Sequence, residues 1–300
     1  MEGADFYSSP LISPDGKFIS FVQWFHPDMP WEGGETVIAP ISSGENGIKV
    51  TGELKIIAGK RGEVNSQQPE WISSNKVLLI SDESGYLNPY TNTISSGKYE
   101  AVLKSSVNED FSEPPWTYGN SNYAILDDTR VIFTSVKNNG STLYLVDLKN
   151  GTYKDLKTPY VEVSLIHRVT EDSIVFKGRK LDEAESVVLY TISDGSYKVI
   201  KKTSNLVETL PIGIISHAQP FSFAVSSKEG EFVHCTFYPP QNPDYTGVDG
   251  EKPPCVVYIH GGPTSRTGQG LTWTVQYFTS RGFSWWVNAS HHIVSIIQLS

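Results

Sequence analysis

A repeated hairpin pattern constrains the fold of this chain more than any other feature of its sequence. Residues 10 to 200 show almost no 3.6-residue apolar period and instead carry short runs of Val, Ile, Phe and Tyr, bounded by Gly, Asn, Asp, Ser or Pro. The expected turn glycines are Gly44, Gly97, Gly151 and Gly195, which lie 53, 54 and 44 residues apart. These runs predict an all-β region built from copies of one unit.

Each copy has room for about four short strands. The candidate central strands, each followed by an outer hairpin, are residues 18–22, 77–80, 131–134 and 173–176. A repeat of roughly 45 to 55 residues with about four strands is typical of β-propeller blades, whereas a helical solenoid would show amphipathic helix periodicity. We therefore predict a mainly β chain with a partial β-propeller of about four blades. A β-sandwich with irregular hairpins is the alternative.

The pattern changes near residue 210. Residues 231–238 predict a strand, and residues 239–254 predict a polar loop rich in Pro and Gly. The following run, residues 255–259, is almost entirely apolar, which is typical of a strand that a parallel sheet buries on both faces. A second type of structure therefore follows the β repeats.

A helix is expected after this apolar strand. Leu271, Val275 and Phe278 lie at helical spacing between residues 268 and 281, and Gly282 is placed to end the helix. Residues 283–287 predict a further strand. Strand, loop, helix and strand in this order are the start of an α/β unit.

Charge excludes some classes of partner. The chain has 24 Lys and Arg against 33 Asp and Glu, a net charge of -9, which repels both a phosphate backbone and an anionic membrane surface. No window approaches the roughly 18 consecutive apolar residues of a membrane span, and the first residues form neither a basic leader nor an apolar stretch. We expect a soluble, cytoplasmic protein with no nucleic-acid or membrane partner.

Few residues have the spacing of metal ligands. Cys235 and Cys255 belong to no C-x-x-C unit and lie near no spaced pair of histidines, so we expect both to be buried, reduced thiols. His291 and His292 have no Cys, Asp or Glu at ligand spacing, and we expect them to be exposed. The sequence predicts neither a metal nor a cofactor.

The segment His260-Gly261-Gly262-Pro263 carries the clearest chemical signal. It follows an apolar strand directly and precedes the predicted helix, which is the position of the HGG-type oxyanion loop of α/β-hydrolases. A backbone N–H must come within about 2.7 to 3.1 Å of a developing oxyanion, and a side chain there would block it. Gly262 is therefore the candidate donor, and Gly261 permits the turn. An ordinary tight turn after a strand is the alternative.

Two pairs of polar residues could be taken for acid/base pairs. His26 with Asp28, and Asp82 with Glu83, lie in segments expected to connect strands. We interpret them as loop and turn residues.

Six segments carry a resemblance to a known family. They are residues 13–17 (SPDGK), 24–31 (WFHPDMPW), 68–71 (QPEW), 81–90 (SDESGYLNPY), 252–265 and 276–283. Together they resemble the prolyl oligopeptidase family of serine peptidases, above all its acylaminoacyl-peptidase and dipeptidyl-aminopeptidase branch. The resemblance covers about residues 8 to 283. It implies a serine peptidase in which a propeller caps an α/β-hydrolase domain and filters substrates by size.

The departures from this family concern the catalytic residues. No G-x-S-x-G occurs in the chain, and the family's nucleophile, acid and base all lie beyond the segment where this sequence stops. After Phe283 the family's apolar strand and Gly-rich continuation are replaced by residues 284–292 and an apolar end, and the earlier propeller blades are missing. We therefore predict a fragment truncated at both ends, with no catalytic residue of its own.

The resulting domain prediction has three parts. Residues 1–210 are the partial propeller, residues 211–230 are a linker and crossover, and residues 231–300 are the truncated start of an α/β-hydrolase domain with an atypical tail. The resemblance implies that the full-length parent cleaves short peptides through an acyl-enzyme, while this chain is expected to be inactive.

Two other functions remain open at this point. The first is a non-enzymatic propeller that binds a peptide or protein, which a closed ring of blades would favour. The second is a carboxylesterase, because esterase oxyanion loops also use HGG; the predicted propeller counts against it.

Overall fold

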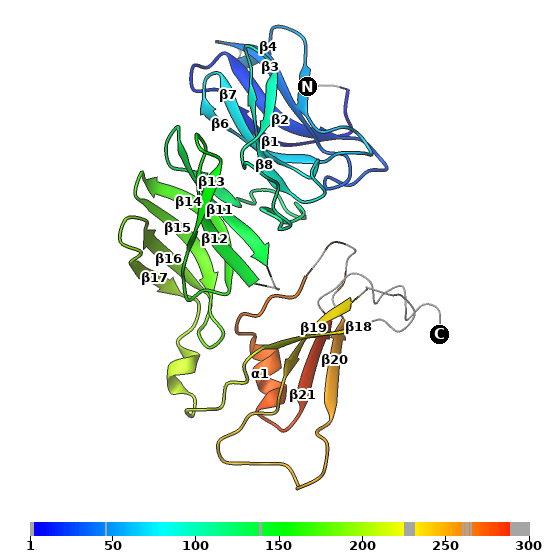
Figure 1. The fold of residues 1–300 in the computed structure, drawn as a ribbon, viewed down its shortest axis with the longest axis vertical. Helices are drawn as coiled ribbons and strands as arrows, with labels where there is room; N and C mark the ends of the chain where they lie inside the picture. The colour runs from blue at the N-terminus through cyan, green and yellow to red at the C-terminus, as the bar shows by residue number, and fades with distance from the viewer. Residues whose placement is uncertain are drawn as a thin grey trace.

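The computed structural model consists of four antiparallel sheets, a fifth mixed sheet and one α-helix (Figure 1). It describes residues 3–45, 47–137, 140–224, 232–259, 261, 264 and 266–288. The four antiparallel sheets follow one another in a curved row, and the first and fourth lie at its opposite ends. The chain is thus a partial β-propeller of four blades followed by an α/β unit, as the sequence predicts.

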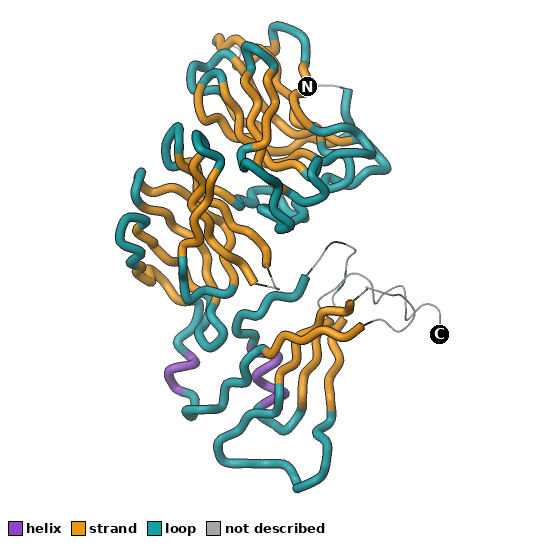
Figure 2. Tube along the Cα trace, viewed as in Figure 1, coloured by secondary structure: helices purple, strands orange, loops and turns teal. Residues whose placement is uncertain are grey.

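The blades share one order of strands, in which neighbours along the chain pair antiparallel. The described parts of the blades consist of strands and loops, and the two helical segments follow blade 4 (Figure 2). Blade 1 contains β1 (Phe6–Ile12), β2 (Phe18–Trp24), β3 (Glu35–Gly44), β4 (Gly47–Val50) and β5 (Lys55–Ala58), which also pairs with β3. Blade 2 contains β6 (Ser66–Ser73), β7 (Lys76–Ser81), β8 (Asn88–Thr93) and β9 (Lys98–Ala101). Blade 3 contains β10 (Tyr123–Ile125), β11 (Arg130–Lys137), β12 (Gly140–Asp147) and β13 (Thr152–Leu156). Blade 4 contains β14 (Glu162–Thr170), β15 (Ser173–Arg179), β16 (Ser186–Thr191) and β17 (Tyr197–Lys202). The four predicted central strands lie within β2, β7, β11 and β15.

Glycine turns close the outer hairpins. Gly97, Gly151 and Gly195 have φ values of 68°, 60° and 70°, a region that glycine enters without steric cost. In blade 1 the residue with positive φ is Gly47, at 89°, and Gly44 instead ends β3 and pairs with it. The prediction of Gly44 as the turn glycine was therefore wrong by three residues.

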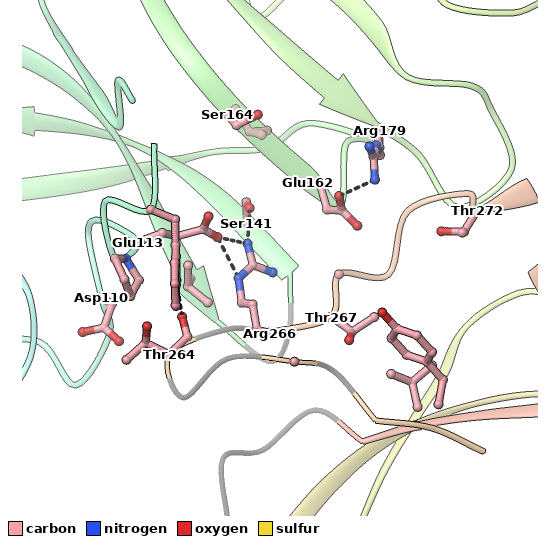
Figure 3. Close-up of a pocket in the computed structure, with 18 of the residues that line it drawn as sticks. Asp110, Glu113, Ser141, Glu162, Ser164, Arg179, Thr264, Arg266, Thr267 and Thr272 are labelled. Carbon is pink, nitrogen blue, oxygen red and sulfur yellow. Dashed lines mark hydrogen bonds and ion pairs between the residues drawn. The ribbon is translucent and has the colours of Figure 1, made fainter. Parts of the chain in front are cut away.

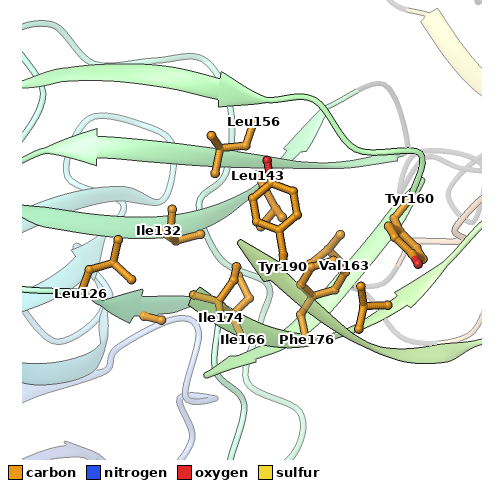
Figure 4. Close-up of a cluster of buried hydrophobic side chains, with 12 residues drawn as sticks. Leu126, Ile132, Leu143, Leu156, Tyr160, Val163, Ile166, Ile174, Phe176 and Tyr190 are labelled. Atoms are coloured by element: carbon orange, nitrogen blue, oxygen red, sulfur yellow. The ribbon is translucent and has the colours of Figure 1, made fainter. Parts of the chain in front are cut away.

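The hydrophobic core lies between successive blades rather than inside one sheet. Blades 3 and 4 enclose a cluster that includes Ile132, Ile166 and Phe176, each at most 1% exposed (Figure 4). Equivalent clusters join blades 2 and 3, around Phe111, and blades 1 and 2, around Leu79. Each blade therefore buries its apolar faces against its neighbours.

The α/β unit follows the 3₁₀ turn Leu206–Thr209. It contains β18 (Gln219–Ala224), β19 (Phe232–Tyr238), β20 (Cys255–Ile259), α1 (Trp273–Thr279) and β21 (Ser284–Asn288). The strand order is β18-β19-β21-β20, and α1 connects the parallel pair β20 and β21. Helix α1 packs on one face of this sheet through Val275 and Phe278, against Tyr238, Trp285 and Val287. It ends before Gly282, whose φ is 88°.

Two expectations for this unit were wrong. Strand β20 is not buried on both faces: Val257, Tyr258 and Ile259 are 54%, 48% and 41% exposed. Among the described residues, β20 pairs with β21 alone and α1 packs on one face of the sheet, so the outer edge and the second face of β20 are left uncovered. Cys255, at the start of β20, is exposed as well, whereas Cys235 on β19 is buried as predicted.

Strand β18 comes from the segment expected as linker, and it pairs along its whole length with β19. The domain boundaries at residues 210 and 231 stay predictions. No helix in the part of the chain that the structure describes is long and apolar enough to cross a membrane.

Candidate functional site

A cavity of about 840 Å³ lies between the propeller and the α/β unit. Its propeller wall comes from the β9–β10 connection and from blades 3 and 4, and its opposite wall comes from β19, β20, β21 and the segment that leads to α1 (Figure 3). Segments more than 100 residues apart in the sequence therefore meet at this site.

The described residues of the segment between β20 and α1, which are 261, 264 and 266–272, contribute to the cavity wall, and Thr264 and Arg266 contact the propeller. Trp116 donates its indole N–H to the carbonyl oxygen of Thr264 at 3.2 Å. The guanidinium of Arg266 donates through Nε to Glu113 Oε1 at 2.8 Å, and its Nη2 lies 3.4 Å from Ser141 Oγ. Residues of the β9–β10 connection thus fix this end of the segment.

Blade 4 holds the other end of the same segment. Glu162, the first residue of β14, accepts a hydrogen bond from the backbone N–H of Gly270 at 2.6 Å. The next backbone N–H, that of Leu271, donates to the carbonyl oxygen of Lys180 at 2.9 Å. Arg179 lies beside Glu162, with Nη1 3.5 Å from Oε2. The segment is therefore attached to blade 4 immediately before α1.

Trp116 also connects the site to blade 1. Its ring packs against Trp31, with ring centroids 4.3 Å apart. Trp31 is the last residue of the WFHPDMPW segment, which starts at the last residue of β2. Arg61 donates hydrogen bonds to Asp28 Oδ2 and to the carbonyl oxygen of His26 in this segment. This segment thus supports the wall of the cavity through one aromatic contact.

The propeller wall contains three carboxylates, those of Asp110, Glu113 and Glu162. Glu113 and Glu162 are each paired with an arginine, whereas Asp110 accepts a hydrogen bond from the backbone N–H of Leu87 at 2.9 Å. Burial raises the pKa of Asp110, and this backbone hydrogen bond partly opposes the shift. Burial also raises the pKa of Asp82, and the nearby charge of Asp110 adds to the effect.

The predicted oxyanion loop is described only in part. Gly261 lines the cavity, and a Cβ added to it would meet nothing within 4 Å. His260, Gly262 and Pro263 lie outside the described residues, so the donor role of Gly262 stays a prediction. His291 and His292 also lie outside them.

Sequence analysis missed the residues that anchor this segment. Glu113, Glu162 and Arg266 belong to no motif, and their partners lie 108 or 153 positions away in the chain. Gly268 and Gly270 carried a possible signal, because a G-x-G directly before a helix often marks a close approach of the backbone to another group.

One serine–histidine pair occurs away from the cavity. Ser222 on β18 and His234 on β19 are cross-strand partners, with Oγ and Nδ1 2.6 Å apart. Among the described residues no carboxylate contacts this imidazole, so the pair lacks the third member of a catalytic triad. No group of three potential metal ligands occurs in the described ranges either.

Solved structures with the same fold are peptidases. The chain is similar to a Mycobacterium tuberculosis puromycin-hydrolyzing peptidase, with 29% identity and a TM-score of 0.85 over 96% of this chain and 42% of that one. It is also similar to a puromycin hydrolase, with 27% identity and a TM-score of 0.84 over 95% of this chain and 42% of the other. Prolyl oligopeptidase B from Galerina marginata shares the fold at 11% identity, with a TM-score of 0.68 over 95% of this chain and 37% of that one.

No family model and no curated protein matches the sequence. The chain spans about two-fifths of the length of the two puromycin-hydrolysing structures. These structural similarities confirm the resemblance of this chain to the prolyl oligopeptidase family of peptidases.

Proposed function

We propose that this chain is the substrate-enclosing part of a serine-type peptidase that acts on short peptides. The observation that carries the proposal is the cavity between the propeller and the α/β unit, to whose wall residues of the segment after β20 contribute. The similar structures are peptidases or hydrolases, and in this chain the HGGP motif follows β20 in the sequence, with its described residue Gly261 in the cavity wall. A peptide in this cavity would lie between the propeller wall and the α/β unit.

The 300 residues supply only part of the chemistry. Peptide cleavage by this route needs a Ser nucleophile, a His base and an oxyanion hole. The G-x-S-x-G that would carry the nucleophile is absent from the sequence, so this chain contributes the enclosure and the candidate donor Gly262. We therefore propose that the chain by itself does not turn over peptides.

Two assays test this proposal. The first combines acetyl-alanyl and aminoacyl nitroanilide turnover with fluorophosphonate labelling, and we expect neither turnover nor labelling. Ser222→Ala is the matched control, because Ser222 contacts His234 in the part of the chain that the structure describes. Stoichiometric labelling of any serine would show that the chain is active.

The second assay tests the enclosure. A short peptide with a photoreactive side chain should cross-link to residues 110–116 and 266–275, which contribute to the cavity wall. Cross-links confined to the outer hairpins of the blades would contradict the proposed site.

An independent propeller module is less well supported. Within the described ranges the four blades form an open row, not the closed ring that such a module would use to bind a partner (Figure 1).

A further inference from the structure

We infer that Glu162 of blade 4 is a positioning residue that fixes residues 266–272, the part directly before α1 of the segment between β20 and α1. The importance of this segment for catalysis rests on the proposed function, because it begins with the candidate oxyanion donor. The contact itself does not depend on that proposal. It would make the propeller a support for the loop, in addition to a wall of the cavity.

The carboxylate of Glu162 is held from two sides. Its Oε1 accepts the Gly270 N–H at 2.6 Å, and its Oε2 faces Arg179. Arg179 is fixed in turn, because its Nε donates to Glu185 Oε2 at 2.8 Å, and Lys177 also lies 3.4 Å from that carboxylate. The acceptor for the loop is thus preorganised within blade 4. A hydrogen bond from a backbone N–H to a charged acceptor is among the stronger ones in proteins.

The backbone of this segment approaches the Glu162 carboxylate closely at two glycines, Gly268 and Gly270. A Cβ added to Gly268 would lie 2.0 Å from Glu162 Oε1, and a Cβ on Gly270 would lie 2.7 Å from the Cβ of Arg179. Neither glycine has a positive φ, so the backbone conformation does not require glycine at these positions. The two glycines are therefore explained by the close approach of the backbone to Glu162 and Arg179, where a side chain would clash.

All three contacts to the propeller follow the candidate donor Gly262 in the sequence, so they hold the chain between that donor and α1. Trp116 and Glu113 hold Thr264 and Arg266, and Glu162 holds Gly270 directly before α1. An oxyanion donor must be placed within a few tenths of an ångström, and such precision needs supporting contacts around the donor. Glu162 provides one such contact from a rigid sheet.

Hydrogen exchange measured by mass spectrometry on the full chain tests the inference without any chemistry at the site. In Glu162→Ala the backbone amide of Gly270 loses its acceptor, and we expect its exchange to be about tenfold faster or more. Glu162→Gln keeps an oxygen acceptor for this amide and should restore most of the protection. A residue that acted only through its charge would not be rescued in this way.

Gly268→Ala provides a second, independent variant. Its methyl group would displace the Glu162 carboxylate, so exchange at Gly270 should accelerate as much as in Glu162→Ala. The double variant should exchange no faster than either single variant, because both remove the same contact. Gly247→Ala, whose Cβ would meet nothing within 4 Å, and Glu171→Gln, at an exposed turn of blade 4, are the matched controls.

The outcomes separate the two proposals. Unchanged exchange at Gly270 in Glu162→Ala and Gly268→Ala would overturn the inference, as would additive effects in the double variant. If Glu162→Ala fails to fold, Gly268→Ala and Glu162→Gln still decide the question. Serine labelling would contradict the proposed function while leaving these exchange results intact.

Discussion

At the scale of single residues, Glu70 is the side chain whose environment is least suited to its charge. It lies on β6, and burial raises the pKa of its carboxyl from 4.5 to about 7. No cation among the described residues pairs with it. Its neighbour Tyr123 is buried, and the charge of Glu70 helps to raise the pKa of that phenol further.

This environment predicts a pH-dependent stability. Because the folded-state pKa lies above the ordinary value, the folded protein binds the proton more tightly than the unfolded chain. Glu70 therefore costs stability progressively as the pH rises from about 4.5 to about 7, and the full cost remains above pH 7. We expect Glu70→Gln to raise the free energy of unfolding by about 1 to 3 kcal/mol at pH 8.

Urea unfolding at two pH values measures this effect. The gain from Glu70→Gln should shrink to less than about 1 kcal/mol at pH 5, where the wild-type carboxyl is already protonated in the folded state. Glu171→Gln, at a side chain that is 70% exposed, should change neither value. An equal gain at both pH values would rule out the explanation by titration.

At the scale of the element, the first strands of three blades contain the same irregularity. Ser9 in β1, Gln68 in β6 and Leu165 in β14 have φ values of 52°, 50° and 53°. In each strand the pairing register shifts at this residue, as in a β-bulge. In blade 2 the bulge is stabilised by Tyr123, whose hydroxyl donates to the carbonyl oxygen of Gln68.

The bulge in β14 predicts an unusual tolerance of glycine. A left-handed conformation costs a non-glycine residue roughly 1 to 2 kcal/mol, which glycine does not pay. We expect Leu165→Gly to lower the free energy of unfolding by about 1 to 2 kcal/mol less than Ile48→Gly, at an exposed and regularly paired position of β4. Equal losses in thermal or urea unfolding would show that the bulge carries no such strain.

The edge strand β20 leads to a prediction about association. Within the described ranges it has an unpaired edge and exposed apolar side chains, a combination that favours pairing with another chain. We expect the isolated chain to associate with rising concentration, and Val257→Lys to reduce this association. Light scattering over a concentration series measures it, with Val169→Lys on β14 as the control. A wild-type chain that stays monomeric throughout would contradict the prediction.

At the scale of the whole molecule, the propeller and the α/β unit are joined by polar contacts around the cavity. Arg266 and Glu113 form one of these contacts. The charges of both side chains can be reversed without placing a charge in the hydrophobic core. Their side chains are 22% and 46% exposed, so solvent screens part of their attraction.

Charge reversal should therefore have a modest and reciprocal effect. Arg266→Glu places two carboxylates together and should lower the free energy of unfolding, and Glu113→Arg in the same chain should restore part of it. We expect a coupling energy of about 0.5 to 1 kcal/mol in a double-mutant cycle, smaller at 1 M salt. Additive effects of the two substitutions at low salt would show that the contact does not couple the two regions.

The fold could be predicted largely from the sequence because its signals are local. Alternation of apolar residues and turn chemistry act within a few residues, so the central strands and the glycine turns at Gly97, Gly151 and Gly195 follow from the sequence alone. The apolar strand before HGGP follows in the same way, and so does a helix before Gly282, although α1 spans Trp273–Thr279 and does not include Leu271.

Only the tertiary structure decided how the cavity is assembled and which segments are exposed. Gly270 meets Glu162 across 108 positions, and Arg266 meets Glu113 across 153, so no local pattern specifies either partner. The exposure of β20 likewise depends on whether a neighbouring strand is present, which its own apolar residues do not encode. The reason is physical: side-chain periodicity determines which face of an element is apolar, whereas the packing of whole sheets determines what that face meets.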